Sequence, residues 1–205
     1  MTAQVLFDAS LLVGSVDNPF AGQLHRAVED ILLTQGIAVF AASLHEDPER
    51  ERSIVREFLR QRVDGLILST VSKNQSYLFS EIERGTPIVF VDRAPNGIEV
   101  DTVTSSNTQG AAAATRHLIE AGHRRIAYLG DDMDIQTARE RNRGFLQGLS
   151  RTGITVVAQN PQRIGELAAE RALARMQGED LPPETIIVPT TLRRRESSEM
   201  PPYVD

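Results

Sequence analysis

The stretch that decides the fold is "PIVFVDRAPNGIEVDTVTSS", residues 87–106. An apolar, β-branched run, "PIVFVD" (87–92), ends at Asp92, and a second strand-like run, "DTVTSS", follows at residues 101–106. Runs of this length and composition predict buried strands. Only about ten residues with a Pro-Asn-Gly turn separate them, and no helix fits into that gap. We therefore expect the chain to cross here into a second lobe.

Similar apolar runs recur along the chain, with amphipathic helical stretches between many of them. They are "LLVGSV" (11–16), "IAVFAA" (37–42), "GLILST" (65–70), "RIAYLG" (125–130) and "ETIIVP" (184–189). Apolar strands flanked by helices are typical of a parallel sheet that is covered on both faces. The sequence therefore predicts an α/β fold with a doubly wound parallel sheet.

The first two helices carry start signals. Asn18 precedes Pro19 and Asp47 precedes Pro48, and each pair predicts a capping side chain followed by proline at the first helical position. In the second helix, charged residues alternate with apolar ones between Glu49 and Arg62. We expect the Glu and Arg side chains of this helix to face solvent.

Composition excludes several protein classes. The 205 residues include no cysteine, which rules out disulfides and thiolate metal sites, and the net charge is −6 with acids and bases mixed. The apolar runs are far shorter than the ~20 residues of a membrane helix. No basic surface for nucleic acid is indicated. The start of the chain shows no secretory signal, so we expect a cytoplasmic protein without membrane contact.

Motifs for catalysis are missing. The sequence has no G-x-G-x-x-G after a strand, no G-x-x-x-x-G-K-[ST] and no G-x-S-x-G, and its four histidines lack metal-ligand spacing. We expect no catalytic residue, no metal and no cofactor. The acidic run "GDDMD" (130–134) could hold Mg²⁺ through Asp131, Asp132 and Asp134. A polar loop is the favoured interpretation, because the lysine and hydroxyl partners of a phosphoacceptor site are not evident.

Candidate binding residues stand where strands end, since open α/β sheets bind ligands at that edge. Phe20 could stack on a flat ligand or begin the core stripe of its helix. Asp92 could accept hydrogen bonds from ligand hydroxyls or pair with Arg93. Arg139, Arg141 and Arg143 lie in the first turns of a helix, where a cation opposes the dipole, so we expect a polar partner for at least one.

Five segments, in order and spacing, resemble the effector-binding core of the lactose/galactose repressor family of bacterial transcription regulators. They are "GSVDNPFAGQLHRAVEDILLTQGIAVF", "EDPERERSIVREFLRQRVDGLIL", "GTPIVFVDR", "HLIEAGHRRIAYLGD" and "TARERNRGFLQGL". The resemblance covers nearly the whole chain from Leu11. It implies two α/β lobes that close around a sugar or nucleobase, as in type I periplasmic binding proteins.

By this resemblance, five residues line the ligand cleft: Phe20, Ser69, Asp92, Arg141 and Gln159. Arg141 would reach a ligand carbonyl or hydroxyl, and Asp92 would accept from hydroxyls. The family also implies a homodimer, and operator DNA bound through an N-terminal helix-turn-helix. The few residues before the first strand are too short for such a headpiece. We therefore expect operator binding only through a headpiece absent from this chain.

A second departure from the family lies inside the chain. After the segment resembling "TARERNRGFLQGLSRTGI", several strand–helix units of the second lobe are absent, and we place the seam at residues 154–157. The expected domains are a complete first lobe, 9–100 plus 158–180, and a truncated second lobe, 101–157 plus 184–198. With part of the cleft wall gone, we expect weak sugar binding or none.

The resulting interpretation is the effector-binding and dimerisation core of a repressor-type regulator, which senses a small sugar-like ligand and is not an enzyme. Two alternatives are a solute-binding protein and a Mg²⁺-dependent, receiver-like phosphoacceptor domain. In a third, the chain only associates with intact relatives.

Overall fold

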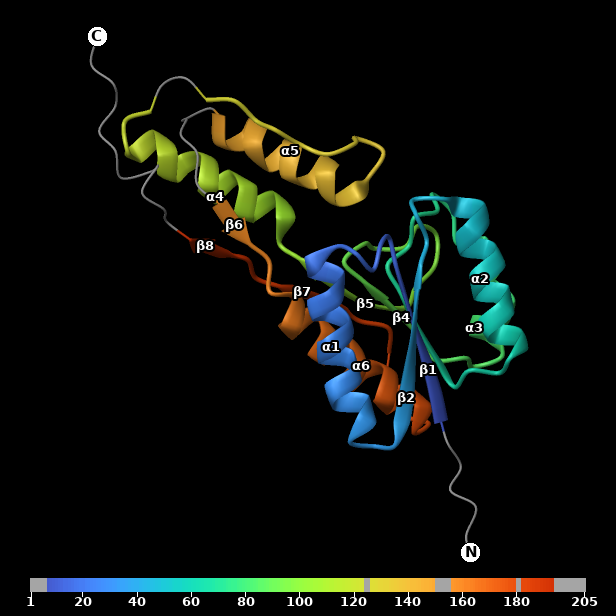
Figure 1. Cartoon of the computed structure of the whole chain (residues 1–205). Helices are drawn as coiled ribbons and strands as arrows, with labels where there is room; N and C mark the ends of the chain where they lie inside the picture. The colour runs from blue at the N-terminus through green and yellow to red at the C-terminus, as the bar shows by residue number, and fades with distance from the viewer. Residues whose placement is uncertain (1–6, 124–125, 150–155, 180–181, 194–205) are drawn as a thin grey trace, which may run out of the picture. The chain divides into compact units, whose positions relative to one another are not determined.

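The computed structural model describes residues 7–123, 126–149, 156–179 and 182–193 (Figure 1). The chain divides into two compact units. The first unit comprises residues 1–104 and 161–186, and the second comprises residues 105–160 and 187–205. The chain therefore passes from one unit to the other three times.

The first unit is built on a parallel sheet with the strand order β2-β1-β3-β4-β5-β7. Its parallel pairs run from β2 through β1, β3 and β4 to β5. This architecture confirms the expected doubly wound α/β fold. The strands are β1 (Phe7–Val13), β2 (Ile37–Ser43), β3 (Gly65–Leu68), β4 (Ile88–Val91), β5 (Asp101–Ser105) and β7 (Thr185–Val188), the last residues of β5 and β7 belonging to the second unit.

Helices cover both faces of this sheet. Helices α1 (Pro19–Leu33) and α6 (Pro161–Met176) lie together on one face, and α2 (Pro48–Arg60) lies on the other (Figure 1). The short helices η1 (Ser76–Leu78) and α3 (Phe79–Glu83) follow β3. Between the sheet and α2 lies a core of fully buried side chains that includes Leu12, Leu44, Val55, Leu66, Leu68 and Phe90.

Both predicted helix starts are confirmed. The Asn18 side chain accepts a hydrogen bond from the Phe20 backbone N–H at 2.9 Å, and Asp47 does the same for Glu49 at 2.9 Å. Each cap is followed by proline at the start of its helix. These local signals satisfy backbone donors that the first helical turn leaves unpaired.

The expectation that all charged side chains of α2 face solvent is wrong for Glu51. Its side chain is fully buried, although the neighbouring Glu49 is 77% exposed. The reason is a set of buried hydrogen-bond donors beneath α2, from which the Glu51 carboxylate accepts.

The expected lobe assignment of residues 101–106 and 184–189 needs correction. Strand β5 pairs with β4 in the first sheet, with Val89 opposite Asp101, and β7 is the edge strand beyond it. Strand β5 can lie parallel to β4 without a helix between them because β4 is short: its four residues span only ~13 Å. The connection, residues 92–100, is long enough to return along that length.

The second unit contains α4 (Asn107–Glu120), α5 (Gln136–Leu149), β6 (Val156–Ala158) and β8 (Thr191–Arg193). Strands β6 and β8 form an antiparallel pair. Helices α4 and α5 pack closely through Gly144 and Gly148, since a Cβ atom at either glycine would overlap α4, at Thr108 and Thr115 respectively.

The strand expected at residues 125–130 is not observed over the described residues 126–130, which are irregular. A single strand gains hydrogen bonds only from a neighbour, and none of the described residues pairs with this segment. Of the expected seam at 154–157, residues 154 and 155 lie outside the described residues, and residues 156 and 157 belong to β6. None of the described helices is both long and apolar enough to span a membrane.

Candidate functional site

Three of the five predicted site residues follow adjacent strands of the first sheet. Phe20 lies in the first turn of the helix after β1, Ser69 directly follows β3, and Asp92 directly follows β4. These strands are parallel neighbours, so the three residues belong to one edge of the sheet. The structure thus brings these three positions to the same sheet edge.

Phe20 is half-buried and is not part of the buried stripe of α1, which consists of Ala21, Leu24, Ala27, Val28 and Leu32. Of the two roles open to it from sequence, the core role is therefore not supported. Its aromatic side chain retains exposed surface at the carboxyl edge of the sheet.

Asp92 has a left-handed backbone with φ of 63°. The Arg93 N–H donates to the Val91 carbonyl at 2.6 Å, which closes a γ-turn around Asp92. Non-glycine residues adopt this conformation at a cost, and such strained residues often cluster at functional sites.

The ion pair considered between Asp92 and Arg93 is long, with 4.0 Å between Arg93 Nε and Asp92 Oδ2. Arg93 instead binds both oxygens of Glu46 at 2.7 Å. Glu46 lies over Gly14, where a Cβ atom would come within 2.6 Å of Glu46 Oε1. Glycine at position 14 thus admits this two-point ion pair beside the end of β1.

The loop after β3, which begins with the buried Ser69, is held by Glu51 of α2. The Glu51 carboxylate accepts hydrogen bonds from the Thr70 hydroxyl at 3.0 Å and from the backbone N–H groups of Val71 and Ser72. The Tyr77 hydroxyl donates to it at 2.6 Å. Burial, together with the Glu51 charge and this bond, raises the pKa of Tyr77 above its usual range.

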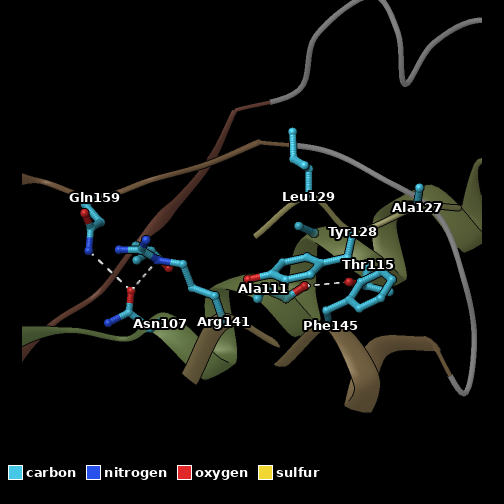
Figure 2. A pocket seen from close by; sticks show the side chains of 11 residues that line it. Asn107, Ala111, Thr115, Ala127, Tyr128, Leu129, Arg141, Phe145 and Gln159 are labelled. Carbon is cyan, nitrogen blue, oxygen red and sulfur yellow. Dashed lines mark hydrogen bonds between the residues drawn. The ribbon is translucent and has the colours of Figure 1, made fainter. Parts of the chain in front are cut away.

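The other two predicted residues meet in the second unit, at Asn107 (Figure 2). Arg141 Nε donates to Asn107 Oδ1 at 3.0 Å, and Gln159 Nε2 donates to the same oxygen at 3.3 Å. Asn107 is 3% exposed, and its Nδ2 donates to Glu140 at 3.0 Å. Asn107 was not among the residues predicted from sequence, although it directly follows Ser105-Ser106 at the start of a helix.

The three arginines of α5 have different surroundings. Arg139 donates to the carbonyl groups of Met133 and Asp134, at 2.9 and 2.7 Å, and so holds the preceding loop. Arg143 is exposed, and Arg141 binds Asn107. The prediction that at least one of them has a polar partner near the helix start is confirmed.

A cavity of about 540 Å³ lies within the second unit, next to this cluster (Figure 2). Its polar end is formed by Asn107, Arg141 and Gln159. Its apolar wall includes Tyr128 and Phe145, whose rings are stacked with centroids 4.9 Å apart.

The acidic run has a local structural role. The Asp131 side chain accepts from the Asp132 N–H and the Asp132 side chain accepts from the Asp134 N–H, each at 2.8 Å. Over the described parts of the chain, no group of three or more His, Asp or Glu residues is arranged to hold a metal ion.

The fold and these residues can now be compared with known proteins. Residues 8–188 match the sequence pattern of a known protein family. This family is described as periplasmic binding proteins and the sugar binding domain of the LacI family. The chain belongs to this family. The match confirms the resemblance to lactose/galactose repressors.

Among relatives of this LacI-family chain is the HTH-type transcriptional repressor PurR of Aliivibrio salmonicida, 31% identical over 158 residues. The alignment covers 76% of the chain but 46% of the repressor, so the chain spans about half the length of that relative.

Two solved structures share the fold of this LacI-family chain. A LacI transcriptional regulator from Lactobacillus brevis has a TM-score of 0.82 at 20% identity, covering 91% of this chain and 100% of that one. The Cra transcriptional dual regulator from Pseudomonas putida, in complex with fructose 1-phosphate, has a TM-score of 0.81 at 17% identity, covering 92% and 98%. At these identities the likeness concerns the fold alone.

Proposed function

We propose that the chain is the effector-binding and dimerising core of a repressor-type transcription regulator that senses a small sugar-like or nucleobase-like ligand. The main support is the match of residues 8–188 to a family of sugar-binding domains. We assign ligand contacts to Phe20, Ser69 and Asp92 in the first unit and to Arg141 and Gln159 in the second unit.

The chemistry of these residues suits a polyhydroxylated ligand. Asp92 offers acceptor oxygens at a sheet edge, Arg141 offers donors, and Phe20 offers an aromatic face for an apolar side of a sugar ring or for a base. The second unit has, among its described residues, only a two-stranded antiparallel sheet. We expect this small sheet to leave part of a bound ligand uncovered. Binding should therefore be weak, with dissociation constants of about 1 mM rather than 1 μM.

Isothermal titration with ribose, glucose, fructose 1-phosphate and adenine tests this function. Arg141→Gln should abolish the heat of whichever of these four ligands binds, whereas Arg143→Gln, which changes an exposed arginine on the same helix, should leave it unchanged. Binding that survives Arg141→Gln in full would contradict the assigned site.

For the homodimer, we propose the free edge of β2 as the contact. This strand ends the sheet, and the side chains of Phe40 and Leu33 nearby are 50% and 64% exposed. An apolar edge strand with unpaired backbone groups favours pairing with another chain. Light scattering should show dimers of the wild type and monomers of Phe40→Lys. A dimer unaffected by this change would place the contact elsewhere.

We assign no DNA contact to these residues. The net charge of −6 disfavours binding to a phosphate backbone. Operator binding would require a helix-turn-helix.

A further inference from the structure

The cavity of the second unit has the size and the lining of a small-molecule site. Its volume, about 540 Å³, lies within the range of roughly 300–1,000 Å³ typical of ligand pockets. Such pockets combine an apolar lining with a few convergent polar groups. All of its lining residues belong to the second unit.

The apolar wall is partly aromatic. Ala111 and Ala114 of α4 present only methyl groups, and the rings of Tyr128 and Phe145, which also line the cavity, stack at an angle of 23°. Aromatic rings favour offset-stacked or edge-to-face contacts with other rings. A flat, apolar ligand body therefore suits this wall better than a hydroxylated sugar ring, whose hydroxyl groups would lose hydrogen bonds to water there.

The polar end presents one positive charge. Arg141 uses Nε to bind Asn107 and forms no ion pair with any acidic residue that the structure describes. The nearby Glu140 binds Asn107 with one oxygen and Gln136 with the other, and it does not line the cavity. The terminal N–H groups of the Arg141 guanidinium suit an acceptor with a single negative charge, such as a carboxylate.

A carboxylate fits this end better than a phosphate. One guanidinium balances one negative charge, whereas a doubly charged phosphate would leave uncompensated charge beside an apolar wall, which is costly. Gln159 Nε2, which binds Asn107 at 3.3 Å, adds a neutral donor beside the guanidinium.

We propose that this cavity binds an aryl-alkyl monocarboxylate, with the carboxylate on Arg141 and Gln159 and the ring against Tyr128 and Phe145. The inference rests on the proposed function in that Arg141 and Gln159 belong to the effector site. It extends that function by naming a ligand class whose apolar body is accommodated by the second unit alone.

The test is isothermal titration of the full chain with benzoate, phenylacetate and 3-phenylpropionate, a series that varies the distance between ring and carboxylate. At least one should bind with a dissociation constant of about 1 mM or below. The corresponding neutral amide should bind about tenfold more weakly, because it loses the charge-assisted bonds.

Matched variants locate the ligand. Arg141→Gln should weaken carboxylate binding about tenfold, to the level of the amide, whereas the exposed Arg143→Gln should bind like the wild type. Ala114→Leu, which fills the cavity, should abolish binding, and circular dichroism should confirm that it remains folded. No saturable binding by any carboxylate, or equal affinity for acid and amide, would overturn the proposal.

Ribose and fructose 1-phosphate titrated into the same preparation separate the two hypotheses. Binding of a sugar without binding of any carboxylate would contradict this inference and leave the proposed function unaffected. A carboxylate response without a sugar response would support the inference and count against a sugar-like effector.

Discussion

Two buried carboxylates organise the first unit at the scale of single residues. Glu51 holds the loop after β3, and Asp101, 1% exposed at the start of β5, accepts from Arg171 at 2.6 Å and Arg175 at 2.8 Å. The Glu184 N–H also donates to Asp101. Asp101 therefore fastens α6 and the start of β7 to the sheet.

Glu51→Gln should destabilise the chain by about 3 kcal/mol, because the amide replaces an acceptor oxygen with a donor that faces other donors. Tyr77→Phe removes one bond to the same carboxylate and should cost about 1 kcal/mol. Urea unfolding measures both, and Glu49→Gln, on the exposed side of α2, should change stability little. Equal effects of Glu51→Gln and Glu49→Gln would show that the buried network contributes nothing.

The lowered pKa of Asp101 predicts that the chain loses stability in acid. Burial raises the pKa of Asp101, but the hydrogen bonds from Arg175, Arg171 and Glu184 outweigh burial and lower its pKa. A lowered folded-state pKa gives stability that is complete above the unfolded value of about 4 and is lost as the pH falls through the folded value. The stability of wild type and Asp101→Asn should therefore converge below pH ~4 in urea titrations at several pH values. A constant difference at all pH values would contradict this assignment.

The role of a residue could be predicted from sequence only where its partners lie close to it in the chain. Asn18 and Asp47 act on the next turn of the chain, so their caps could be predicted from sequence. Glu51 could not be distinguished from Glu49, because its partners Val71, Ser72 and Tyr77 lie in the loop after β3 and in η1, far from Glu51 in the chain. Asn107 was missed for the same reason, since Arg141 and Gln159 reach it from distant positions.

At the scale of elements, small residues allow helices to pack closely. Gly165 of α6 faces α1, where a Cβ atom would come within 2.8 Å of Ala27 Cβ and the Leu24 carbonyl oxygen. Gly144 and Gly148 do the same for α5 against α4. These contacts fix the spacing of both helix pairs.

Gly148→Ala should lower stability by about 2 kcal/mol, because the added methyl group overlaps Thr115. Gly22→Ala is the matched control, since a Cβ atom at this helical position meets nothing within 4 Å. It should stabilise the chain by up to ~1 kcal/mol through helix propensity. Thermal denaturation of both variants checks the pair, and a stabilised Gly148→Ala would mean that α4 and α5 pack less closely than described.

Most elements could be predicted from apolar runs and caps, but their pairing could not. Strand β5 was assigned to the wrong lobe because the short connection argued against a parallel neighbour, and sequence does not reveal how short β4 is. The run at 125–130 has strand composition yet forms no strand over its described part, because a strand also depends on a partner.

At the scale of the whole molecule, the two units differ in their cores. Among the described residues, the buried hydrophobic side chains of the second unit are Ala112, Ala114, Leu118, Ala138 and Val188. The first unit buries many large ones, including Leu11, Leu24, Ile67 and Phe90. Since stabilisation scales with the apolar area buried, the second unit gains much less from burial.

We therefore expect the second unit to unfold first. In hydrogen exchange with increasing urea, amides of α4 and α5 should lose protection at lower concentrations than those of β1 and β3. Binding of a carboxylate in the cavity should narrow this gap. Simultaneous loss of protection in both units would indicate a single cooperative structure.

The threefold passage of the chain between the units has a consequence for its synthesis. When residues 1–104 have left the ribosome, five strands of the sheet are present, but α6, which packs against Leu24 and Ala27 in the buried stripe of α1, has not been translated. The nascent chain exposes this apolar face while the intervening second-unit segment emerges. Chaperone capture during translation should therefore begin once α1 has emerged and end only after α6 follows.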